Sequence, residues 1–356
     1  MSKVLTVTVP AFNAERCLST NLDSLLNQGE FAAAQGLTQE EMSSFLEILI
    51  IDDGSSDTTG DIADRYEQEH LSVVRVLHKR NGGHGSCINA GIRAAGGRYF
   101  KVVDSDDWVD PAAFARLVRF LCTADSDLVA SGFYWRFERK GDVSVQDYPR
   151  RAEIKEPFSG VVYGKEYSFD EVADHIYLKM HHLATRTAIY RDHSISIDEH
   201  MYYVDTEYNL FPVPYIETVC FLPDFVYQYR LGREGQSMSR ENMRMHRRQY
   251  RKVLAHLLRF YSSLRQGEIP CSEEKIRYIE GLLARIYASY IKIVLGMPCA
   301  RGKRSYLRGL DDSLRRNYPE IYRANRNRAL VLLRISGFGL TGMAEFAVKL
   351  WRGSVY

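Results

Sequence analysis

Short runs of β-branched and other apolar residues alternate, along the first 130 positions, with stretches of helical periodicity. Four of these runs have the length and composition of buried strands, and they cover residues 4–9, 47–51, 73–77 and 99–103. Strands that alternate with helices are typical of βα units, in which the strands form a mostly parallel sheet. The pattern therefore predicts an α/β domain whose sheet is flanked by helices.

The intervening helices follow from the spacing of their apolar residues. A leucine repeat between residues 18 and 26 predicts a helix that opens near Asn13, a residue type suited to an N-cap. Another helix is expected to begin at Asp110-Pro111, a capping residue followed by proline at the first helical position. Residues 29–45 form an insertion, and we expect this insertion to contain one short helix.

The pattern changes along the second half of the chain. Residues 132–167 mix aromatic, charged and glycine residues, which indicates irregular strands or a hairpin. Residues 240–261 and 273–295 show helical periodicity. We therefore expect a catalytic-type α/β domain over residues 1–239 and a helical region over residues 240–356.

Composition narrows the class of protein. The chain has 356 residues, of which 45% are hydrophobic and 26% charged, so it is neither a disordered chain nor a polytopic membrane protein. Its six cysteines include no CxxC pair, which argues against a structural zinc site or a disulfide framework. The first residues lack the features of a signal peptide. A reducing, cytoplasmic setting is the expectation.

Charge is distributed unevenly. The net charge is +2, but residues 301–356 hold twelve Lys and Arg against four Asp and Glu. Such a basic region can contact anionic phospholipid at the inner face of a membrane, or it can be the solvated side of a packed helical hairpin. Charged residues and glycines interrupt the apolar stretch over residues 329–351, so it does not read as a membrane span. No motif supports nucleic acid as a partner.

Chemically unusual segments follow all four predicted strands. They are Pro10-Ala11-Phe12-Asn13, Asp52-Asp53-Gly54-Ser55, Asn81-Gly82-Gly83-His84-Gly85 and Asp104-Ser105-Asp106-Asp107. The carboxyl ends of parallel strands meet at one edge of a sheet, where loops surround a crevice and helix N-termini point at the ligand. We therefore expect these four segments to line one site.

Each segment suits a nucleoside diphosphate. An exposed Phe12 can stack on a base, Asp53 can accept from a base or a ribose hydroxyl, and glycine-rich backbone can approach phosphates closely. Asp104 and Asp106 offer hard oxygen ligands for Mg²⁺ or Mn²⁺. Singly, Phe12 could be a core aromatic and Asp53 a turn residue. Together, four consecutive strand ends of this kind favour a ligand site. The glycines do not match a dinucleotide fingerprint.

These motifs resemble glycosyltransferase family 2, the inverting GT-A-type enzymes. The resemblance rests on Val7–Asn13, Ile51–Asp57, Asn81-Gly82-Gly83 with Asn89-Ala90-Gly91, and Val103–Trp108. It is strong over residues 4–121 and continues weakly to about residue 239. It implies a GT-A-type, Rossmann-like sheet, a nucleotide-diphosphate sugar donor with a UDP-sugar favoured, a Mg²⁺ or Mn²⁺ ion, and transfer with inversion at the anomeric carbon.

The resemblance also implies roles for particular residues. It places the two D-x-D carboxylates on ribose and metal, with Asp106 the stronger metal candidate and Asp104 the second. His84 lies in the glycine-rich loop near the expected diphosphate, although a surface or capping role is equally compatible. Arg233 follows a segment similar to the family's Tyr-x-Tyr-Arg motif and could reach the leaving phosphates. The full set expected to bind the nucleotide sugar is Pro10, Ala11, Phe12, Asn13, Asp53, Gly83, His84, Asp104, Ser105 and Arg233.

Inversion requires a base that removes the proton of the acceptor hydroxyl. Family members carry this carboxylate in an acidic or glycine-containing pair before an aromatic-rich helix, and Asp205 matches that position. Val204 replaces the usual neighbour, so Glu207 and Asp198 stay open as alternatives. His181-His182 lies between the metal motif and this base, a region where contacts with the acceptor are expected. A zinc-binding role for the two histidines is not expected.

The resemblance implies a hydroxyl acceptor on a growing or polyprenyl-linked glycan of surface polysaccharide assembly, with possible peripheral contact to the membrane through the basic region. Two other functions stay open. A sugar-phosphate nucleotidyltransferase would share the architecture, but it would carry a glycine-rich basic loop directly after the first strand, which Pro10–Asn13 is not. A non-catalytic nucleotide-sugar or glycan-binding module is favoured only by Val204.

Overall fold

The computed structural model describes residues 3–27, 29–138, 144–152, 158–232, 240–297 and 302–350. Contacts divide the chain into two compact units, Met1–Leu231 and Gly232–Tyr356. The expected boundary after residue 239 stays a prediction, because residues 233–239 lie outside the described ranges.

The first unit is built on a mixed sheet. Its strands in the described residues are β1 (Leu5–Ala11), β2 (Leu46–Asp52), β3 (Val74–His78), β4 (Tyr99–Val102), β5 (Trp108–Val109), β6 (Leu128–Phe137), β7 (Arg150–Arg151), β8 (Glu166–Ser168), β9 (Leu183–Arg186) and β10 (Thr218–Leu231). They follow the order β3-β2-β1-β4-β9-β6-β10-β5, with β7 on β6 and β8 on β10. The four predicted strands, β1 to β4, pair in parallel. Antiparallel β9 joins β4 to β6.

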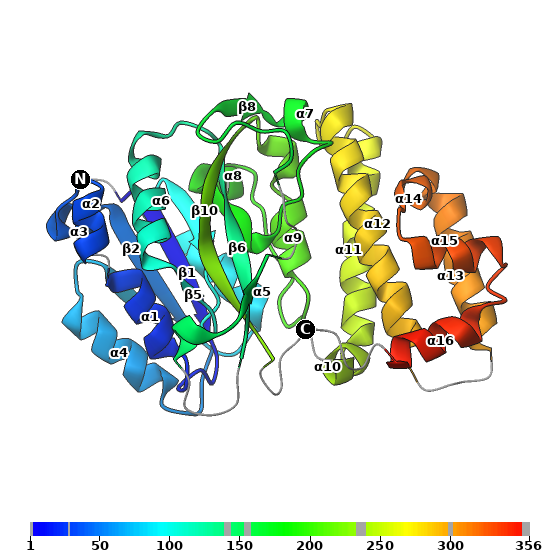
Figure 1. Ribbon diagram of the computed structural model, residues 1–356, viewed down its shortest axis with the longest axis horizontal. Helices are drawn as coiled ribbons and strands as arrows, with labels where there is room; N and C mark the ends of the chain where they lie inside the picture. The colour runs from blue at the N-terminus through cyan, green and yellow to red at the C-terminus, as the bar shows by residue number, and fades with distance from the viewer. Residues whose placement is uncertain are drawn as a thin grey trace. The chain divides into compact units, whose positions relative to one another are not determined.

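Helices cover both faces of this sheet. In the described residues they are α1 (Leu18–Leu26), α2 (Gly29–Ala34), α3 (Gln39–Phe45), α4 (Thr59–Glu69), α5 (His84–Ala94), α6 (Pro111–Thr123), α7 (Phe169–Val172), α8 (Thr187–Asp192) and α9 (Asp205–Leu210), with 3₁₀ turns η1 (Val145–Asp147), η2 (Met180–His182) and η3 (Val213–Tyr215). Helices α1, α4 and α6 lie on one face, and α5 and α8 on the other (Figure 1). The predicted α/β fold class, a mostly parallel sheet flanked by helices, is confirmed.

The alternation of residues along β1 explains how the two faces are packed. Leu5, Val7 and Val9 are fully buried on the side of α1 and α6, where apolar side chains fill the core. Thr8 points to the other side, and a Cβ at Gly91 of α5 would collide with the Thr8 side chain. The absence of a side chain at Gly91 therefore lets α5 lie directly on the strand.

The prediction that Asn13 caps the first helix is wrong. Helix α1 begins only at Leu18, after a Cys17 cap without a side-chain hydrogen bond. Asn13 has a φ of 49°, and its side-chain oxygen accepts from the Ser56 amide at 2.9 Å. Its own amide donates to Ser55 Oγ at 3.1 Å. Asn13 therefore ties the loop after β1 to the loop after β2 instead of closing a helix end. The predicted cap at Asp110 is confirmed, since its side chain accepts from the Ala113 amide at 2.9 Å.

The second unit is helical over its described residues. Its helices are α10 (Arg240–Met245), α11 (Arg247–Arg265), α12 (Glu273–Leu295), α13 (Lys303–Asn317), α14 (Pro319–Ala324), α15 (Arg328–Ile335) and α16 (Thr341–Leu350). Helix α12 packs on α11, α14 and α16, with fully buried Ile279 and Leu283 among its core residues. None of the helices in the described part of the chain combines the length and apolar character needed to cross a bilayer.

Candidate active site

The loops that follow β1, β2, β3 and β4 lie at one edge of the sheet. Ala11 pairs with Asp52, Asp52 pairs with His78, and Thr8 pairs with Val102, so the four strands end in neighbouring positions. Backbone hydrogen bonds continue beyond the strands: the Asp53 amide donates to the Ala11 carbonyl at 2.9 Å. The segments that the sequence singled out are therefore side by side.

The segment after β1 divides into a buried and an exposed part. Pro10 and Ala11 are the last residues of the strand, and both are buried. The Phe12 ring is 52% exposed. A core position for Phe12, the alternative interpretation of the sequence, is thereby excluded. An exposed aromatic ring at this edge is available to stack on a planar ligand.

Asp53 holds the glycine loop in place. Its Oδ1 accepts from Lys79 Nζ at 2.5 Å and from the Gly82 amide at 2.9 Å. Its Oδ2 accepts from the Gly83 amide at 2.7 Å. Gly83 has a φ of 80°, in the left-handed region that favours glycine. We call Asp53, Lys79, Gly82 and Gly83 the Asp53 clamp.

The geometry of the clamp bears on the expected role of Asp53. Only 3% of its side chain is exposed, and both oxygens already accept hydrogen bonds within the protein. A contact between Asp53 and a nucleoside therefore stays a prediction. Lys79 was missed by sequence reasoning. A lysine directly after the end of a strand, close to an acidic turn, was the only available signal.

His84 opens helix α5 and contacts the acidic loop. Its Nε2 lies 2.7 Å from Asp104 Oδ1. Burial works against a charged imidazole, but the carboxylates of Asp104, Asp205 and Asp106 outweigh it and raise the pKa of His84. His84 is therefore favoured as an imidazolium beside the acidic loop, at the N-terminal end of α5. The His84 side chain is 31% exposed, and Gly83, not His84, holds the N-cap position.

The acidic loop after β4 is held from beneath. The Asp107 carboxylate is buried, and its two oxygens accept from the Tyr227 hydroxyl at 2.5 Å and from the Arg230 amide at 2.7 Å. The same hydroxyl accepts from the Asp104 amide at 3.2 Å. Asn21 Nδ2 donates to the carbonyls of Asp104 and Asp107 at 3.0 and 2.9 Å. These contacts fix the loop through its backbone and through Asp107.

The fixed loop leaves Asp104 and Asp106 at its outer side. Asp104 is a quarter exposed, Asp106 is half-buried, and Ser105 between them is buried. Burial, and then the charges of Asp106 and Asp104, raise the pKa of Asp107 well above its usual range. Carboxyl groups thus gather at this loop, and their hard oxygen donors suit a divalent cation. Asp104 and Asp106 are the residues that could hold it.

Asp205 belongs to the same group of charges. It opens the short helix α9, where burial raises its pKa, with a further contribution from Asp104. The cations of His84 and Lys179 act in the opposite direction. The charges of His84 and Asp104 thus act on Asp205, and the segment that leads to α9 lies against the glycine loop, because the His200 amide donates to the Gly82 carbonyl at 2.5 Å. We call Asp104, Asp106, Asp107 and Asp205 the acidic rim.

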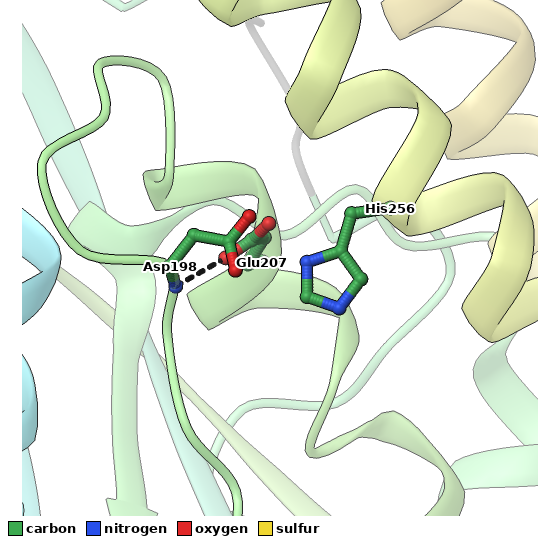
Figure 2. A group of neighbouring side chains, drawn as sticks. All are labelled: Asp198, Glu207 and His256. Atoms are coloured by element: carbon green, nitrogen blue, oxygen red, sulfur yellow. Dashed lines mark hydrogen bonds between the residues drawn. The ribbon is translucent and has the colours of Figure 1, made fainter.

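The two alternative candidates for the base make a contact of their own. The Glu207 side chain is fully buried, and its Oε2 accepts from the Asp198 amide at 2.8 Å, as Figure 2 shows. Glu207 therefore fixes the backbone of the segment that leads to α9. The charge of Asp205 interacts with Asp104 of the acidic loop.

An aromatic wall lies behind the rim. The His181 ring stacks on Phe133 at 4.7 Å and lies 4.6 Å from the rings of both Tyr227 and Tyr229. Burial, with nearby cations, lowers the pKa of His181 well below its usual range, so its imidazole is neutral. Burial, and then the rim carboxylates, raise the pKa of Tyr229 well above the usual value. The sequence pointed to Tyr227 and Tyr229 only through the Tyr-x-Tyr-Arg motif.

The structure thus brings most of the expected residues together. Phe12, Gly83, His84, Asp104, Asp106 and Asp205 lie on adjoining segments. Pro10, Ala11, Asp53 and Ser105 are buried beneath these segments, and the exposed Asn13 ties two of the loops together. Arg233 lies outside the described residues.

Comparison with known proteins adds the family. The glycosyl transferase family 2 model matches residues 6–195, more than half of the chain. The chain therefore belongs to glycosyl transferase family 2, and the resemblance and the enzyme class expected from the sequence are confirmed.

Curated relatives and solved structures agree with this assignment. The uncharacterized glycosyltransferase EpsJ of Bacillus subtilis is 36% identical over 134 residues, which are 38% of this chain and 35% of EpsJ. The poly(ribitol-phosphate) beta-glucosyltransferase of Bacillus spizizenii is 33% identical over 125 residues, which are 35% of this chain and 18% of that protein. The match thus spans well under half the length of these relatives.

The fold likeness extends further along the chain. The structure of S. aureus TarS 1–349 in complex with UDP-GlcNAc aligns with a TM-score of 0.64 and 17% identity, covering 99% of this chain and 93% of that one. At this identity the likeness concerns the fold, and it confirms the GT-A type expected from the sequence.

Proposed function

We propose that the chain transfers a sugar from a nucleotide-diphosphate sugar, with a UDP-sugar favoured, to a hydroxyl acceptor, with inversion at the anomeric carbon. One observation carries the proposal: an exposed aromatic ring, a glycine loop and an acidic rim adjoin one another at the carboxyl edge of the sheet. The structure of TarS, which has a similar fold, contains UDP-GlcNAc, and this supports the choice of donor.

The donor is bound along the edge from Phe12 to Asp104. Phe12 stacks on the base, and the backbone of the glycine loop leaves room for the diphosphate. His84 contributes positive charge at the first turn of α5, where the amides and the helix dipole also favour an anion. Asp104 and Asp106 are the residues that would hold a Mg²⁺ or Mn²⁺ ion. When bound, the ion stabilises the negative charge of the leaving diphosphate.

Asp205 is the base in this proposal. As the acceptor oxygen forms its bond to the anomeric carbon, the bond from that carbon to the diphosphate oxygen breaks, and the hydroxyl proton passes to the Asp205 carboxylate. Its raised pKa makes this carboxylate a better proton acceptor than an exposed aspartate. The aromatic wall behind the rim keeps bulk water away from one side of the reacting atoms.

The acceptor in this proposal is a growing or lipid-linked glycan of surface polysaccharide assembly. The name of the Bacillus spizizenii relative, a poly(ribitol-phosphate) beta-glucosyltransferase, supports a polymeric acceptor. A cytoplasmic location stays a prediction. Family membership speaks against the nucleotidyltransferase alternative, and the interaction of Asp205 with the charges of His84 and Asp104 speaks against a decayed site.

Calorimetry tests the proposal. The full chain is titrated with UDP-, GDP- and dTDP-sugars, each with and without Mn²⁺, and one donor is expected to bind in a manner that depends on the ion. Asp106→Ala should remove this Mn²⁺-dependent binding, because it deletes a ligand of the ion. Asp61→Ala removes an exposed carboxylate from α4 and serves as the matched control. Parental, Mn²⁺-dependent donor binding by Asp106→Ala would overturn the assignment of the rim.

A further inference from the structure

Helix α16 carries its polar and apolar residues on unexpected sides. Thr341 and Glu345 face inward and are buried, and Glu345 pairs with Lys303 at 2.8 Å. On the outer side, Met343 and Phe346 are 70% and 62% exposed. A surface helix normally presents its apolar residues to the core and its polar residues to water. The outer side of α16 is therefore suited to an apolar surrounding.

The preceding helix, α15, also exposes large apolar side chains. In α15, Leu330 and Leu333 are buried, whereas Leu332 and Ile335 are 58% and 78% exposed. Leu340, in the turn between the two helices, is also exposed. We call Leu332, Ile335, Leu340, Met343 and Phe346 the outer apolar face. Large apolar side chains gathered within fifteen residues of chain mark an interaction site more often than isolated ones do.

Helix α13 carries several exposed arginines. Arg304, Arg308 and Arg315 recur at spacings of four and seven residues, so they lie along one side of the helix. We call them the arginine stripe. Arg304 Nη2 donates to the Gly337 carbonyl at 3.2 Å, which places the start of the stripe at the turn between α15 and α16. Asp312 lies 3.8 and 3.9 Å from Arg308 and Arg315, and it balances only one of these charges.

The surrounding chain is basic as well. Residues 302–350 contain ten Lys and Arg against four Asp and Glu. Two of these acidic groups form largely buried salt bridges, Glu345 with Lys303 and Asp311 with Arg334. The surface beside the outer apolar face therefore carries a clear excess of positive charge.

We propose that the outer apolar face docks on an anionic phospholipid surface. Its five apolar side chains enter the boundary between headgroups and acyl chains, and the arginine stripe contacts lipid phosphates. A second copy of the chain fits less well, because a two-fold contact through this face would bring the two arginine stripes near each other. The surface combines apolar and positive character, and an anionic lipid layer matches both.

Vesicle sedimentation tests the proposal on the full chain. Parental protein should bind vesicles of phosphatidylcholine with phosphatidylglycerol and should bind pure phosphatidylcholine vesicles at least about tenfold more weakly. Met343→Ser with Phe346→Ser should weaken binding to the anionic vesicles about tenfold or more, because two apolar side chains are lost from the interface. Arg308→Gln with Arg315→Gln should have an effect of about the same size.

Matched controls use exposed residues elsewhere. Leu71→Ser with Val162→Ser removes two exposed apolar side chains from the first unit. Lys252→Gln with Arg259→Gln removes two exposed charges from α11. Both pairs should bind anionic vesicles within about twofold of the parent. All eight positions are exposed, so the fold should persist, and far-ultraviolet circular dichroism checks this.

Three results would overturn the docking proposal: no binding of parental protein to anionic vesicles, equal binding to neutral ones, or controls as weak as the test variants. Sedimentation velocity without vesicles tests whether a second copy of the chain binds to the outer apolar face. A concentration-dependent dimer that Met343→Ser with Phe346→Ser abolishes would assign the face to self-association. None of these measurements requires glycosyl transfer, so the docking proposal can fail while the proposed function holds.

Discussion

The Asp53 clamp and the acidic rim lie at the same edge of the sheet, but their charges are balanced in opposite ways. In the clamp, one carboxylate faces the Lys79 ammonium and two backbone amides. In the rim, the carboxylates of Asp104, Asp106 and Asp205 act on His84, and those of Asp104 and Asp106 act on Asp107. The clamp carboxylate is paired within the protein, whereas in the rim the charge of Asp104 raises the pKa values of both Asp107 and Asp205.

This difference has an energetic meaning. A raised carboxyl pKa means that the folded protein disfavours the charged form relative to the unfolded chain. The raised pKa values of Asp107 and Asp205 show that the rim lowers stability at neutral pH. We infer that the clamp stabilises the conformation of the loops, whereas the rim would itself be stabilised by a positively charged ligand.

The largest expected effect separates activity from stability at the rim. Asp205→Asn should leave donor binding intact but lower turnover by about two to four orders of magnitude, as loss of a general base does. The same change should leave the free energy of unfolding at pH 7 unchanged or raised, because it removes a disfavoured charge. Initial rates and urea unfolding measure the two effects, with Asp61→Asn as control. A rate within about twofold of the parent would remove Asp205 from the mechanism.

A stability loss of opposite sign is expected at the clamp. Asp53→Asn should lower the free energy of unfolding by about 3 kcal/mol, because it leaves the Lys79 ammonium without its carboxylate. Urea unfolding at neutral pH measures the change. Adding Lys79→Met should recover part of the loss, since the unpaired charge is then gone. If Asp53→Asn is as stable as the parent, the clamp does not hold the loop.

A smaller loss is expected where the rim is supported from beneath. Tyr227→Phe should lower the free energy of unfolding by about 1 to 2 kcal/mol, because Asp107 loses a donor and the Asp104 amide loses an acceptor. It should also weaken the Mn²⁺-dependent donor binding, since the loop that carries Asp104 and Asp106 is less fixed. Tyr163→Phe, at an exposed tyrosine, is the control. Unchanged stability and binding would show that the hydroxyl does not support the loop.

The smallest effect concerns His78, beside the clamp. Hydrogen bonds to Asp52 and Asp64 raise its pKa. A raised folded pKa gives stability that is full below the unfolded value of about 6.5 and is lost as the pH rises through the folded value. Because the imidazole is half exposed, we expect only a few tenths of a kcal/mol.

The His78 prediction is measured as a pH dependence. Urea midpoints of the parent should fall slightly between about pH 6 and pH 8, and His78→Gln should flatten this part of the curve. His175→Gln, at an exposed histidine, should retain the parental slope. A parental slope in His78→Gln would assign the pH dependence to other groups.

The sequence predicts best what local pattern determines. Strands β1 to β4 lie within two residues of their expected bounds, and the loops after them share an edge because parallel strands must end together. The helix cap at Asp110 was found because its proline neighbour specifies it. These features depend on residues close together along the chain.

Features that depend on distant partners were not predicted. Asn13 was expected to cap a helix, but Ser56 offers its side chain a hydrogen bond across 43 residues. Tyr227 supports Asp107 across 120 residues, and no periodicity encodes that contact. The order of β9, β6 and β10 likewise follows from long-range pairing. For the candidate site, the sequence therefore indicated the segments that meet at the edge of the sheet better than the residues that hold those segments in place.

The close packing of helix α5 has a consequence for how a ligand would meet this site. A Cβ at Gly91 would collide with Thr8 in the sheet, and one at Gly85 would collide with the Asp198 carbonyl, so the helix is wedged between core and loop. His84 is the first residue of this tightly packed helix. Backbone packing therefore fixes the end of the helix that carries the His84 imidazole, and the site is preorganised. We expect hydrogen exchange in α5 to be slow, and its rate to change little when a nucleotide binds.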